Sequence, residues 1–222
     1  MLKVIMFDDV RSYRDSVKAY WKNSKDIFLA AEFEDANNAV AEVRRHQPDV
    51  VLMDIRMPGK SGINAMVSIK KVFPKTKVLI LTAFPDDDKI FAALQLGASG
   101  FAFKEDVEDL DRVIQDVYKY GGYLTPTVAA RVASFFNDPS VRSQEMYEEL
   151  TPRETAVLTC MMKGKSRKMI ADDLVISEFT VNDHLKSIYK KLHVNSAIII
   201  RTQNKSRIRS NLLFFFKKLK FK

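Results

Sequence analysis

Acidic side chains follow two short apolar runs in the first quarter of the chain. Asp8 and Asp9 come directly after the run 3–7, and Asp54 comes directly after the run 50–53. If these runs are neighbouring strands of a parallel sheet, three carboxylates converge at its carboxyl edge, where open α/β sheets form their ligand sites. Such a cluster repels itself unless a cation neutralises it. Hard oxygen ligands with room for water suit Mg²⁺.

Two further polar residues end later apolar runs. Thr82 follows the run 77–81, and Lys104 follows the run 101–103. A carboxylate beside Mg²⁺ can act as a nucleophile toward a phosphoryl group. The ammonium of Lys104 would neutralise the transferred charge, and the Thr82 hydroxyl would hydrogen-bond a phosphoryl oxygen. Acidic residues often end strands only because loops are polar, but five suitable residues at suitable strand ends favour a phosphoacceptor site.

Apolar runs and amphipathic stretches alternate through the first 120 residues, and this alternation would position the five polar residues. The pattern predicts βαβ units and a parallel sheet. Five strands and five helices indicate a doubly wound, flavodoxin-like α/β domain. If its strand order is 2-1-3-4-5, the first and third strands are neighbours. The strands are expected at 3–7, 27–32, 50–53, 77–81 and 101–103, and the helices near 11–23, 35–46, 62–73, 86–97 and 106–120.

An all-α unit is expected after residue 149. Thr151-Pro-Arg-Glu154 is a capping box with proline at the first helical position, which is a specific signal for a helix start. Ser177 is a second N-cap, and the helix that it begins has an apolar stripe on one side and a polar, mostly basic face on the other. Helices are expected at 152–163, 166–173 and 177–192, in the pattern of a helix-turn-helix.

Positive charge gathers in the second half of the chain. Residues 1–138 hold 19 Lys+Arg and 20 Asp+Glu, a net charge of −1, whereas residues 139–222 hold 17 and 8, a net charge of +9. A basic second half points to a polyanionic partner. Residues 205–222 contribute seven of the basic residues and no acid. We expect this tail to be disordered, and its role stays open between non-specific DNA affinity and contact with an anionic membrane surface.

The helix expected at 177–192 fits the major groove of DNA, because one side can pack while the other stays polar. A solvated basic face is the alternative interpretation. The side chains expected at DNA bases or phosphates are Lys165, Ser166, Lys168, Thr180, Asn182, Asp183, Lys186 and Lys190. Asp183 would repel a phosphate or accept a hydrogen bond from a cytosine amino group.

About residues 2–120 resemble the receiver domains of bacterial response regulators. The resemblance implies that Asp54 accepts a phosphoryl group from a sensor histidine kinase. It also implies that Asp9, Asp54 and the backbone carbonyl of Arg56 hold Mg²⁺, with help from Asp8. The motifs that carry it are Phe-Asp8-Asp9, Met-Asp54-Ile-Arg-Met-Pro-Gly, Leu-Thr82-Ala and Phe-Ala-Phe-Lys104.

The same resemblance implies a switch at the phosphoacceptor site. Thr82 and Phe101 match the family's switch pair, in which the hydroxyl moves toward the phosphoryl group and the aromatic ring rotates inward. An apolar residue on a central strand is equally expected as part of the core, so both interpretations of Phe101 stay open.

Residues 149–196 resemble the LuxR-type helix-turn-helix of NarL/FixJ response regulators. The resemblance implies promoter DNA as a partner, a homodimer when the protein is phosphorylated, and RNA polymerase as a further candidate partner. The motifs are Leu-Thr-Pro-Arg-Glu154, Gly164-Lys-Ser, Ile170-Ala, Ile176-Ser-Glu-Phe-Thr180-Val, His184 and Lys190-Lys-Leu192. The alanine-rich helix that usually follows in the family is missing from this sequence.

The sequence thus predicts a receiver domain at 1–121, a linker with a short helix at 122–148, a DNA-binding domain at 149–204 and the tail at 205–222. One cysteine, Cys160, fits a reducing compartment, and the apolar runs fall short of the about 20 residues that span a bilayer. We therefore expect a cytoplasmic transcription regulator without membrane insertion, and no enzyme beyond Mg²⁺-dependent phosphotransfer to Asp54. We further predict that the unphosphorylated receiver restrains the DNA-binding helix.

Two other functions compete with this interpretation. A phosphatase-like hydrolase would use the same acidic Mg²⁺ site, but it needs a further acid or base near the phosphoacceptor, and Arg56 does not supply one. A binding module that works without phosphorylation is disfavoured because the set of acceptor residues is complete.

Overall fold

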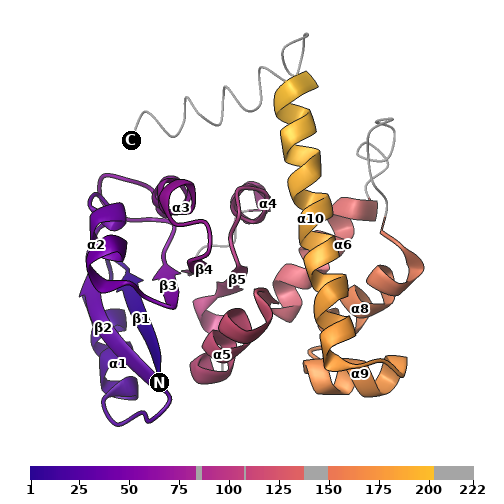
Figure 1. Cartoon of the computed structure of the whole chain (residues 1–222), viewed down its shortest axis with the longest axis horizontal. Helices are drawn as coiled ribbons and strands as arrows, with labels where there is room; N and C mark the ends of the chain where they lie inside the picture. The colour runs from indigo at the N-terminus through magenta and orange to yellow at the C-terminus, as the bar shows by residue number, and fades with distance from the viewer. Residues whose placement is uncertain (84–86, 108, 138–149, 203–222) are drawn as a thin grey trace.

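The structure is a computed structural model that describes residues 1–83, 87–107, 109–137 and 150–202 (Figure 1). Its strands are β1 (Leu2–Phe7), β2 (Ile27–Phe33), β3 (Val50–Met53), β4 (Lys77–Thr82), β5 (Gly100–Phe103) and β6 (Tyr123–Leu124). The helices of the first half are α1 (Arg11–Trp21), α2 (Ala39–His46), α3 (Gly62–Val72), α4 (Asp87–Gln95), the 3₁₀ helix η1 (Lys104–Asp106) and α5 (Leu110–Tyr120). Those of the second half are α6 (Pro126–Asn137), α8 (Pro152–Met162), α9 (Arg167–Leu174) and α10 (Glu178–Thr202).

The strands form one parallel sheet in the order β2-β1-β3-β4-β5-β6. The expected five-stranded doubly wound domain is confirmed, and β6 extends it by a sixth strand. Gly121 ends α5 with a φ of 77°, which turns the chain back toward the sheet. Gly100 lets β6 approach closely, because a Cβ at this position would lie 2.7 Å from the Tyr123 carbonyl oxygen. A two-residue strand is too short to show an alternating pattern in the sequence.

Alternate strand residues face two cores, one on each side of the sheet. In β1, Ile5 and Phe7 pack with the buried residues of α2, α3 and α4. Val4 and Met6 face the other side, where α1 and α5 contribute Trp21 among others. Both faces are covered, which explains why the strands read as continuous apolar runs.

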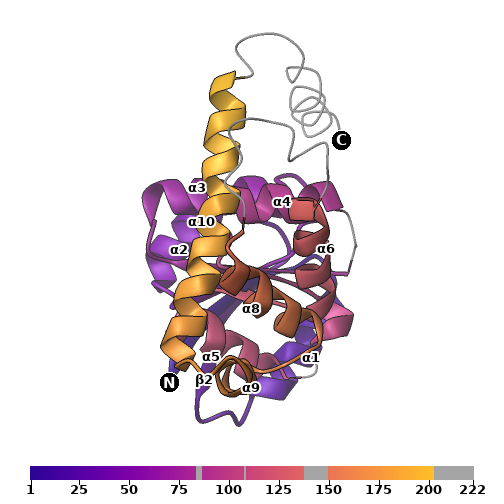
Figure 2. The ribbon, with the colours of Figure 1, turned by 90° about the vertical axis from the view of Figure 1, so that its right-hand side faces the viewer.

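The helical domain packs directly on the receiver and shares its core on the α4 side of the sheet. Helix α10 contacts α4 of the receiver as well as α8 and α9, and Figures 1 and 2 show it running alongside α8. Helix α6, expected within a linker, packs against α8 and buries Val128 and Val132 in this core. We therefore treat α6 as a part of the helical core, whereas residues 138–149 lie outside the described residues.

Helix α10 is longer than the sequence indicated. The expected helix 177–192 continues to Thr202. The expected domain end at residue 204 and the tail 205–222 lie outside the described residues. Among the residues that the structure describes, no helix has the length and apolar character to cross a membrane.

Candidate phosphoacceptor site and DNA-binding face

The register of β1 and β3 brings two of the predicted carboxylates together. Phe7 pairs with Met53, so that Asp8 and Asp54 leave the sheet side by side, and the Asp54 amide donates to the Phe7 carbonyl at 2.9 Å. Carboxylate oxygens of Asp8, Asp9 and Asp54 lie within 4.8 Å of one another. Asp8 and Asp54 are buried, whereas Asp9 is exposed and open to solvent. The predicted acidic cluster is therefore present as a compact group.

The neighbouring strands add the hydroxyl and the ammonium. Thr82 pairs with Phe103 across β4 and β5, which places Lys104 beside the end of β4. The Nζ atom of Lys104 lies 2.5 Å from Asp8 Oδ2 and 3.2 Å from Asp54 Oδ2, and Thr82 is fully buried. Together these groups present carboxylates for a cation, a nucleophilic oxygen and a positive charge for an oxyanion.

The electrostatics of the cluster suit a divalent cation. Burial raises the pKa of Asp8 above its usual range, although Lys104 opposes the shift, and the nearby charge of Asp54 raises it further. Ionising both Asp8 and Asp54 therefore costs free energy, and a bound cation would reduce this cost. The oxygen donors of Asp8, Asp9 and Asp54 match the preference of Mg²⁺. Arg56 follows two residues after Asp54, in the loop before α3.

Gly62 lets α3 begin close to Asp54, which the sequence reasoning missed. A Cβ at Gly62 would lie 1.7 Å from the Asp54 carbonyl oxygen, so only glycine allows α3 to begin this close to Asp54. The Gly62 amide donates to the Ile55 carbonyl at 3.0 Å. The Ile55 amide in turn donates to Asp54 Oδ1 at 2.6 Å. A glycine at the first position of an expected helix was the available signal.

Two residues of α1 also reach the site without having been predicted there. The Nζ atom of Lys104 lies 4.3 Å from the centroid of the Tyr13 ring. Arg14 Nη1 donates to the Asp8 carbonyl oxygen at 2.6 Å. The mixed sequence of α1 gives no signal for contacts that its side chains make with other elements.

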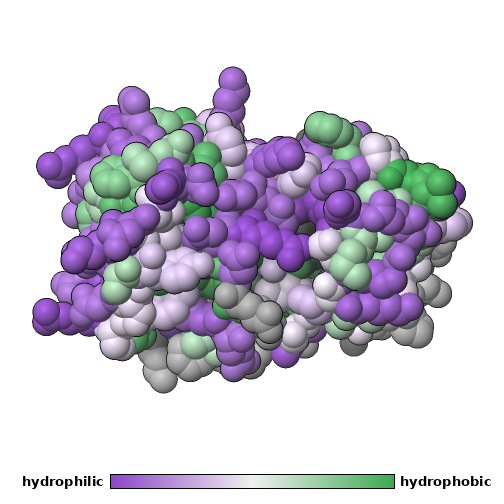
Figure 3. Space-filling model, turned by 90° about the horizontal axis from the view of Figure 1, so that it is seen from below, coloured by the Kyte–Doolittle hydropathy of each residue, from purple (hydrophilic) through white to green (hydrophobic). Residues whose placement is uncertain are grey.

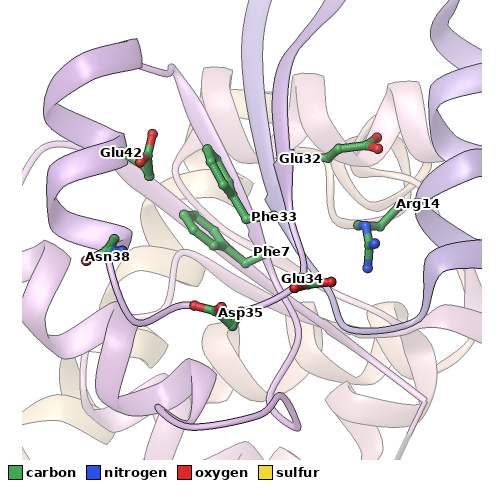
Figure 4. Close-up of a pocket in the computed structure, with 8 residues that line it drawn as sticks. All are labelled: Phe7, Arg14, Glu32, Phe33, Glu34, Asp35, Asn38 and Glu42. Atoms are coloured by element: carbon green, nitrogen blue, oxygen red, sulfur yellow. The ribbon is translucent and has the colours of Figure 1, made fainter.

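An acidic hollow of about 350 Å³ lies beside the carboxyl ends of β1 and β2 (Figure 4). The rings of Phe7 and Phe33 stack at 4.9 Å at its floor. Its lining residues are Phe7, Arg14, Glu32, Phe33, Glu34, Asp35, Asn38 and Glu42. The concentration of carboxylates produces a negative potential next to the Asp8 cluster, which favours the approach of cations.

Phe101 and its neighbour connect the site to α6. Phe101 is fully buried and makes an edge contact with Phe103 at 5.8 Å. The guanidinium of Arg131, on α6, lies 5.4 Å from the Phe103 ring. The Phe101 ring thus lies inside the core in this structure, and its role as a switch stays a prediction.

The residues expected at DNA form two groups on the helical domain. Lys165, Ser166 and Lys168 lie at the start of α9, where Ser166 caps the helix and Lys165 pairs with Asp173. The other group, on α10, comprises Thr180, Asn182, Asp183, Lys186 and Lys190. Asp183, Lys186 and Lys190 are exposed, and Asp183 lies 3.4 Å from Lys186 Nζ. The expected N-cap at Ser177 is present, since its hydroxyl accepts from the Thr180 amide at 3.0 Å.

Asn182 differs from its neighbours because it is buried, with 4% of its surface exposed. In the orientation that satisfies its hydrogen bonds, its amide nitrogen donates to the Tyr120 carbonyl at 2.6 Å and its oxygen accepts from Lys186 Nζ at 3.0 Å. The Tyr120 hydroxyl also donates to Glu178 Oε2 at 3.1 Å. The first turns of α10 are therefore bound to the end of α5 in the receiver.

A second set of contacts ties α9 to the same end of α5. Arg167 is buried, its Nη1 lies 2.5 Å from Asp116 Oδ2, and its Nη2 donates to the Gly122 carbonyl. Its guanidinium also lies 4.5 Å from the centroid of the Tyr120 ring. Burial raises the pKa of Asp116, and this effect outweighs the lowering by Arg167. The pair therefore combines close geometry with a large desolvation cost.

The junction of the two domains is hydrophilic on the side where α5 and α9 lie (Figure 3). A cavity of about 320 Å³ opens there between α5, β6 and the helices α8, α9 and α10. On the α4 side, by contrast, the domains share an apolar core. The interface is thus apolar on one side and held by ionic and hydrogen-bonded contacts on the other.

Inside the helical domain, Glu154 organises the start of α8. The predicted capping box with Thr151 is present. Glu154 is buried, and its carboxylate also accepts from Ser187 at 2.6 Å and from Lys191 at 2.8 Å, both on α10. Burial alone would raise its pKa, but these hydrogen bonds and those of Thr151 lower the pKa to about 2.

Comparisons with known proteins match both halves of the chain. Residues 4–115 match the family described as response regulator receiver domain, and residues 148–200 match the bacterial regulatory proteins of the luxR family. The transcriptional regulatory protein DegU of Brevibacillus brevis is 33% identical over 87% of this chain and 89% of its own length.

Solved structures of response regulators are also similar to this chain. The response regulator ChrA of a heme-sensing two-component system is 29% identical, with a TM-score of 0.50, over 91% of this chain and 96% of that one. RcsB, solved as two dimers bound to two parallel DNAs, is 23% identical with a TM-score of 0.53, over 86% of this chain and 92% of that one. The RcsB likeness concerns the fold alone.

Proposed function

We propose that phosphorylation of Asp54 releases the DNA-binding helix of this protein from its receiver. The chain belongs to the two-component response regulators in which a receiver domain is joined to a LuxR-type DNA-binding domain. Proteins of this family regulate transcription and are not enzymes in the ordinary sense.

In the phosphotransfer step, a carboxylate oxygen of Asp54 attacks the phosphorus of a phosphohistidine on the sensor kinase. The new O–P bond forms as the N–P bond to the histidine breaks, and the imidazole leaves with the electron pair. Lys104, which lies 3.2 Å from Asp54 Oδ2, neutralises charge on the phosphoryl oxygens. Asp8, Asp9, Asp54 and the Arg56 carbonyl would hold Mg²⁺, which supplies further charge neutralisation when bound.

The observation that carries the coupling is the burial of Asn182 against Tyr120. A side chain of the helix expected in the major groove cannot contact a base while it donates to the receiver backbone. Arg167, at the start of α9, is likewise occupied by Asp116. We infer that the described conformation is closed to DNA, as expected for the unphosphorylated protein.

Two segments connect the neighbourhood of Asp54 to the helical domain, one through Thr82 and one through Lys104. Thr82 ends β4, and the chain then leads to α4, which contacts α10. Phe103 precedes Lys104 and contacts Arg131 of α6. A movement of Thr82 toward a phosphoryl group would therefore act on α4, and a movement of Lys104 would act on α6.

The partners follow from the same proposal. A sensor histidine kinase donates the phosphoryl group, and the released helix binds promoter DNA. Both steps would take place in the cytoplasm. By analogy with the RcsB dimers on DNA, we propose a homodimer as the DNA-binding form. RNA polymerase is a further proposed partner at the promoter.

Binding to promoter-length DNA at fixed salt tests the proposal. Full-length protein and protein ending at Asn204 are measured with and without an acyl phosphate donor and Mg²⁺, each beside its Asp54→Asn variant. We expect sequence-specific binding that phosphorylation strengthens in both lengths. In the Asp54→Asn variants this strengthening should be absent, and the affinity should stay at that of the unphosphorylated protein. Binding that is independent of the donor would contradict the coupling. Binding that ignores sequence and disappears with residues 205–222 would assign the DNA affinity to the tail instead.

A further inference from the structure

The ring of Tyr13 forms one wall around the Lys104 ammonium. Tyr13 lies near the start of α1, and its half-buried ring packs against the core on the α1 side of the sheet. The Nζ atom of Lys104 lies 4.3 Å from the centre of the ring, within the range of a cation–π contact. The Lys104 side chain is 11% exposed. Its ammonium is thus enclosed between Asp8, Asp54 and this aromatic face.

The chemistry of the ring differs from that of the two carboxylates. Burial and then the charges of Asp8 and Asp54 raise the pKa of Tyr13 to about 12, so the phenol is neutral at physiological pH. A neutral ring attracts the ammonium through its negative face and accepts none of its N–H groups in a strong hydrogen bond. The ring holds the ammonium on that side without using its N–H donors, which point to the carboxylates of Asp8 and Asp54 here and would turn to phosphoryl oxygens on Asp54.

We propose that Tyr13 is a positioning residue for phosphoryl transfer, whose ring fixes the Lys104 ammonium beside Asp54. A lysine head group sits on four rotatable carbons, and ordering it costs side-chain entropy that a preformed contact reduces. When Asp54 becomes phosphorylated, its carboxylate charge no longer holds Lys104 in the same way, whereas the Tyr13 contact persists. The inference rests on the proposed function, because it acts through Lys104 on Asp54.

The test compares rates of phosphorylation by an acyl phosphate with Mg²⁺ in wild type, Tyr13→Leu and Tyr13→Phe full-length protein. Leucine keeps an apolar side chain but removes the ring, and we expect it to slow phosphorylation about three- to tenfold. Phenylalanine keeps the ring face and should restore the rate to within about twofold. A thermal midpoint checks folding, and Tyr13→Met replaces the leucine variant if the latter unfolds.

A double-mutant cycle with Lys104→Met distinguishes positioning from a general packing effect. We expect Lys104→Met alone to slow phosphorylation strongly, and Tyr13→Leu to add nothing in that background. An unchanged or faster rate for Tyr13→Leu, or an equal loss in the Lys104→Met background, would overturn the role of Tyr13 while leaving the proposed function intact. A normal rate for Lys104→Met would instead overturn the proposed phosphotransfer chemistry, and the inference with it.

Discussion

Arg167 of α9 and Asp116 of α5 form a buried ion pair across the two domains, with 2.5 Å between Nη1 and Oδ2. The desolvation cost of such a pair offsets much of its Coulomb attraction, so its net contribution to domain closure is small. Loss of one partner, however, leaves the other charge buried and uncompensated. The pair is therefore suited to a contact that must open under a modest signal and must still close in its absence.

We predict that Asp116→Ala opens the unphosphorylated protein. A lone buried Arg167 destabilises the closed form by up to about 3–5 kcal/mol, and 1.4 kcal/mol already changes an equilibrium tenfold. DNA affinity of the unphosphorylated variant should rise at least about tenfold toward that of the phosphorylated wild type. Fluorescence anisotropy with promoter DNA measures the change. The control Asp15→Asn removes an exposed charge from α1 and should leave DNA affinity unchanged.

Tyr120→Phe is predicted to weaken the same closure by a smaller amount. The variant removes the hydrogen bond from the hydroxyl to Glu178 but keeps the ring beside Arg167. A hydrogen bond of this kind contributes about 0.5–1.5 kcal/mol. DNA affinity without phosphorylation should therefore rise about two- to tenfold, while affinity after phosphorylation stays the same. An equal gain in both states would mean that Tyr120 acts on the DNA-bound form instead.

The predictable part of the molecule is the part built from local patterns. The strands of the doubly wound sheet followed from apolar runs. The convergence of Asp8, Asp9, Asp54, Thr82 and Lys104 followed from the residues that end these runs, given the strand order 2-1-3-4-5. The caps at Thr151 and Ser177 followed from side-chain chemistry at helix starts.

The contacts between the domains could not be predicted in this way. The polar face of α10 indicated Asn182 as a residue exposed to DNA, but tertiary packing buries it against Tyr120. The strand β6 has only two residues and no period to detect. The contacts of Gly62 and Tyr13 depend on close approaches between elements, which no pattern within one element encodes.

Gly62→Ala is predicted to impair phosphorylation without touching a charged group. Its Cβ would lie 1.7 Å from the Asp54 carbonyl oxygen, so either α3 or the Asp54 loop must shift. Overpacking of this kind costs about 1–3 kcal/mol of stability. Phosphorylation by an acyl phosphate should slow at least about tenfold, because small displacements of reacting groups have large effects on rate. Ser61→Ala is the matched control, since the Ser61 side chain makes no capping hydrogen bond.

The stability of the DNA-binding domain should depend on pH through Glu154. Its folded pKa of about 2 lies below the unfolded value of 4.5, so the stabilisation is complete above about pH 4.5 and is lost as the pH falls toward 2. A shift of this size corresponds to about 3 kcal/mol. Glu154→Gln should therefore lower the free energy of unfolding at pH 7 by an amount of that order.

Urea unfolding at pH 7, 5 and 3.5 measures this effect, because the gap between wild type and Glu154→Gln should be constant from pH 7 to 5 and narrower at pH 3.5. Glutamine keeps the size of the side chain but has only one acceptor oxygen, whereas Ser187 and Lys191 donate to different oxygens of Glu154. The gap at pH 7 therefore combines the lost charge with one lost hydrogen bond, and its narrowing at low pH reports the charge. Asp172→Asn removes an exposed carboxylate from the same domain and serves as the control. A gap that persists unchanged at pH 3.5 would show that Glu154 stabilises the domain by packing, and that its ionisation is not coupled to folding.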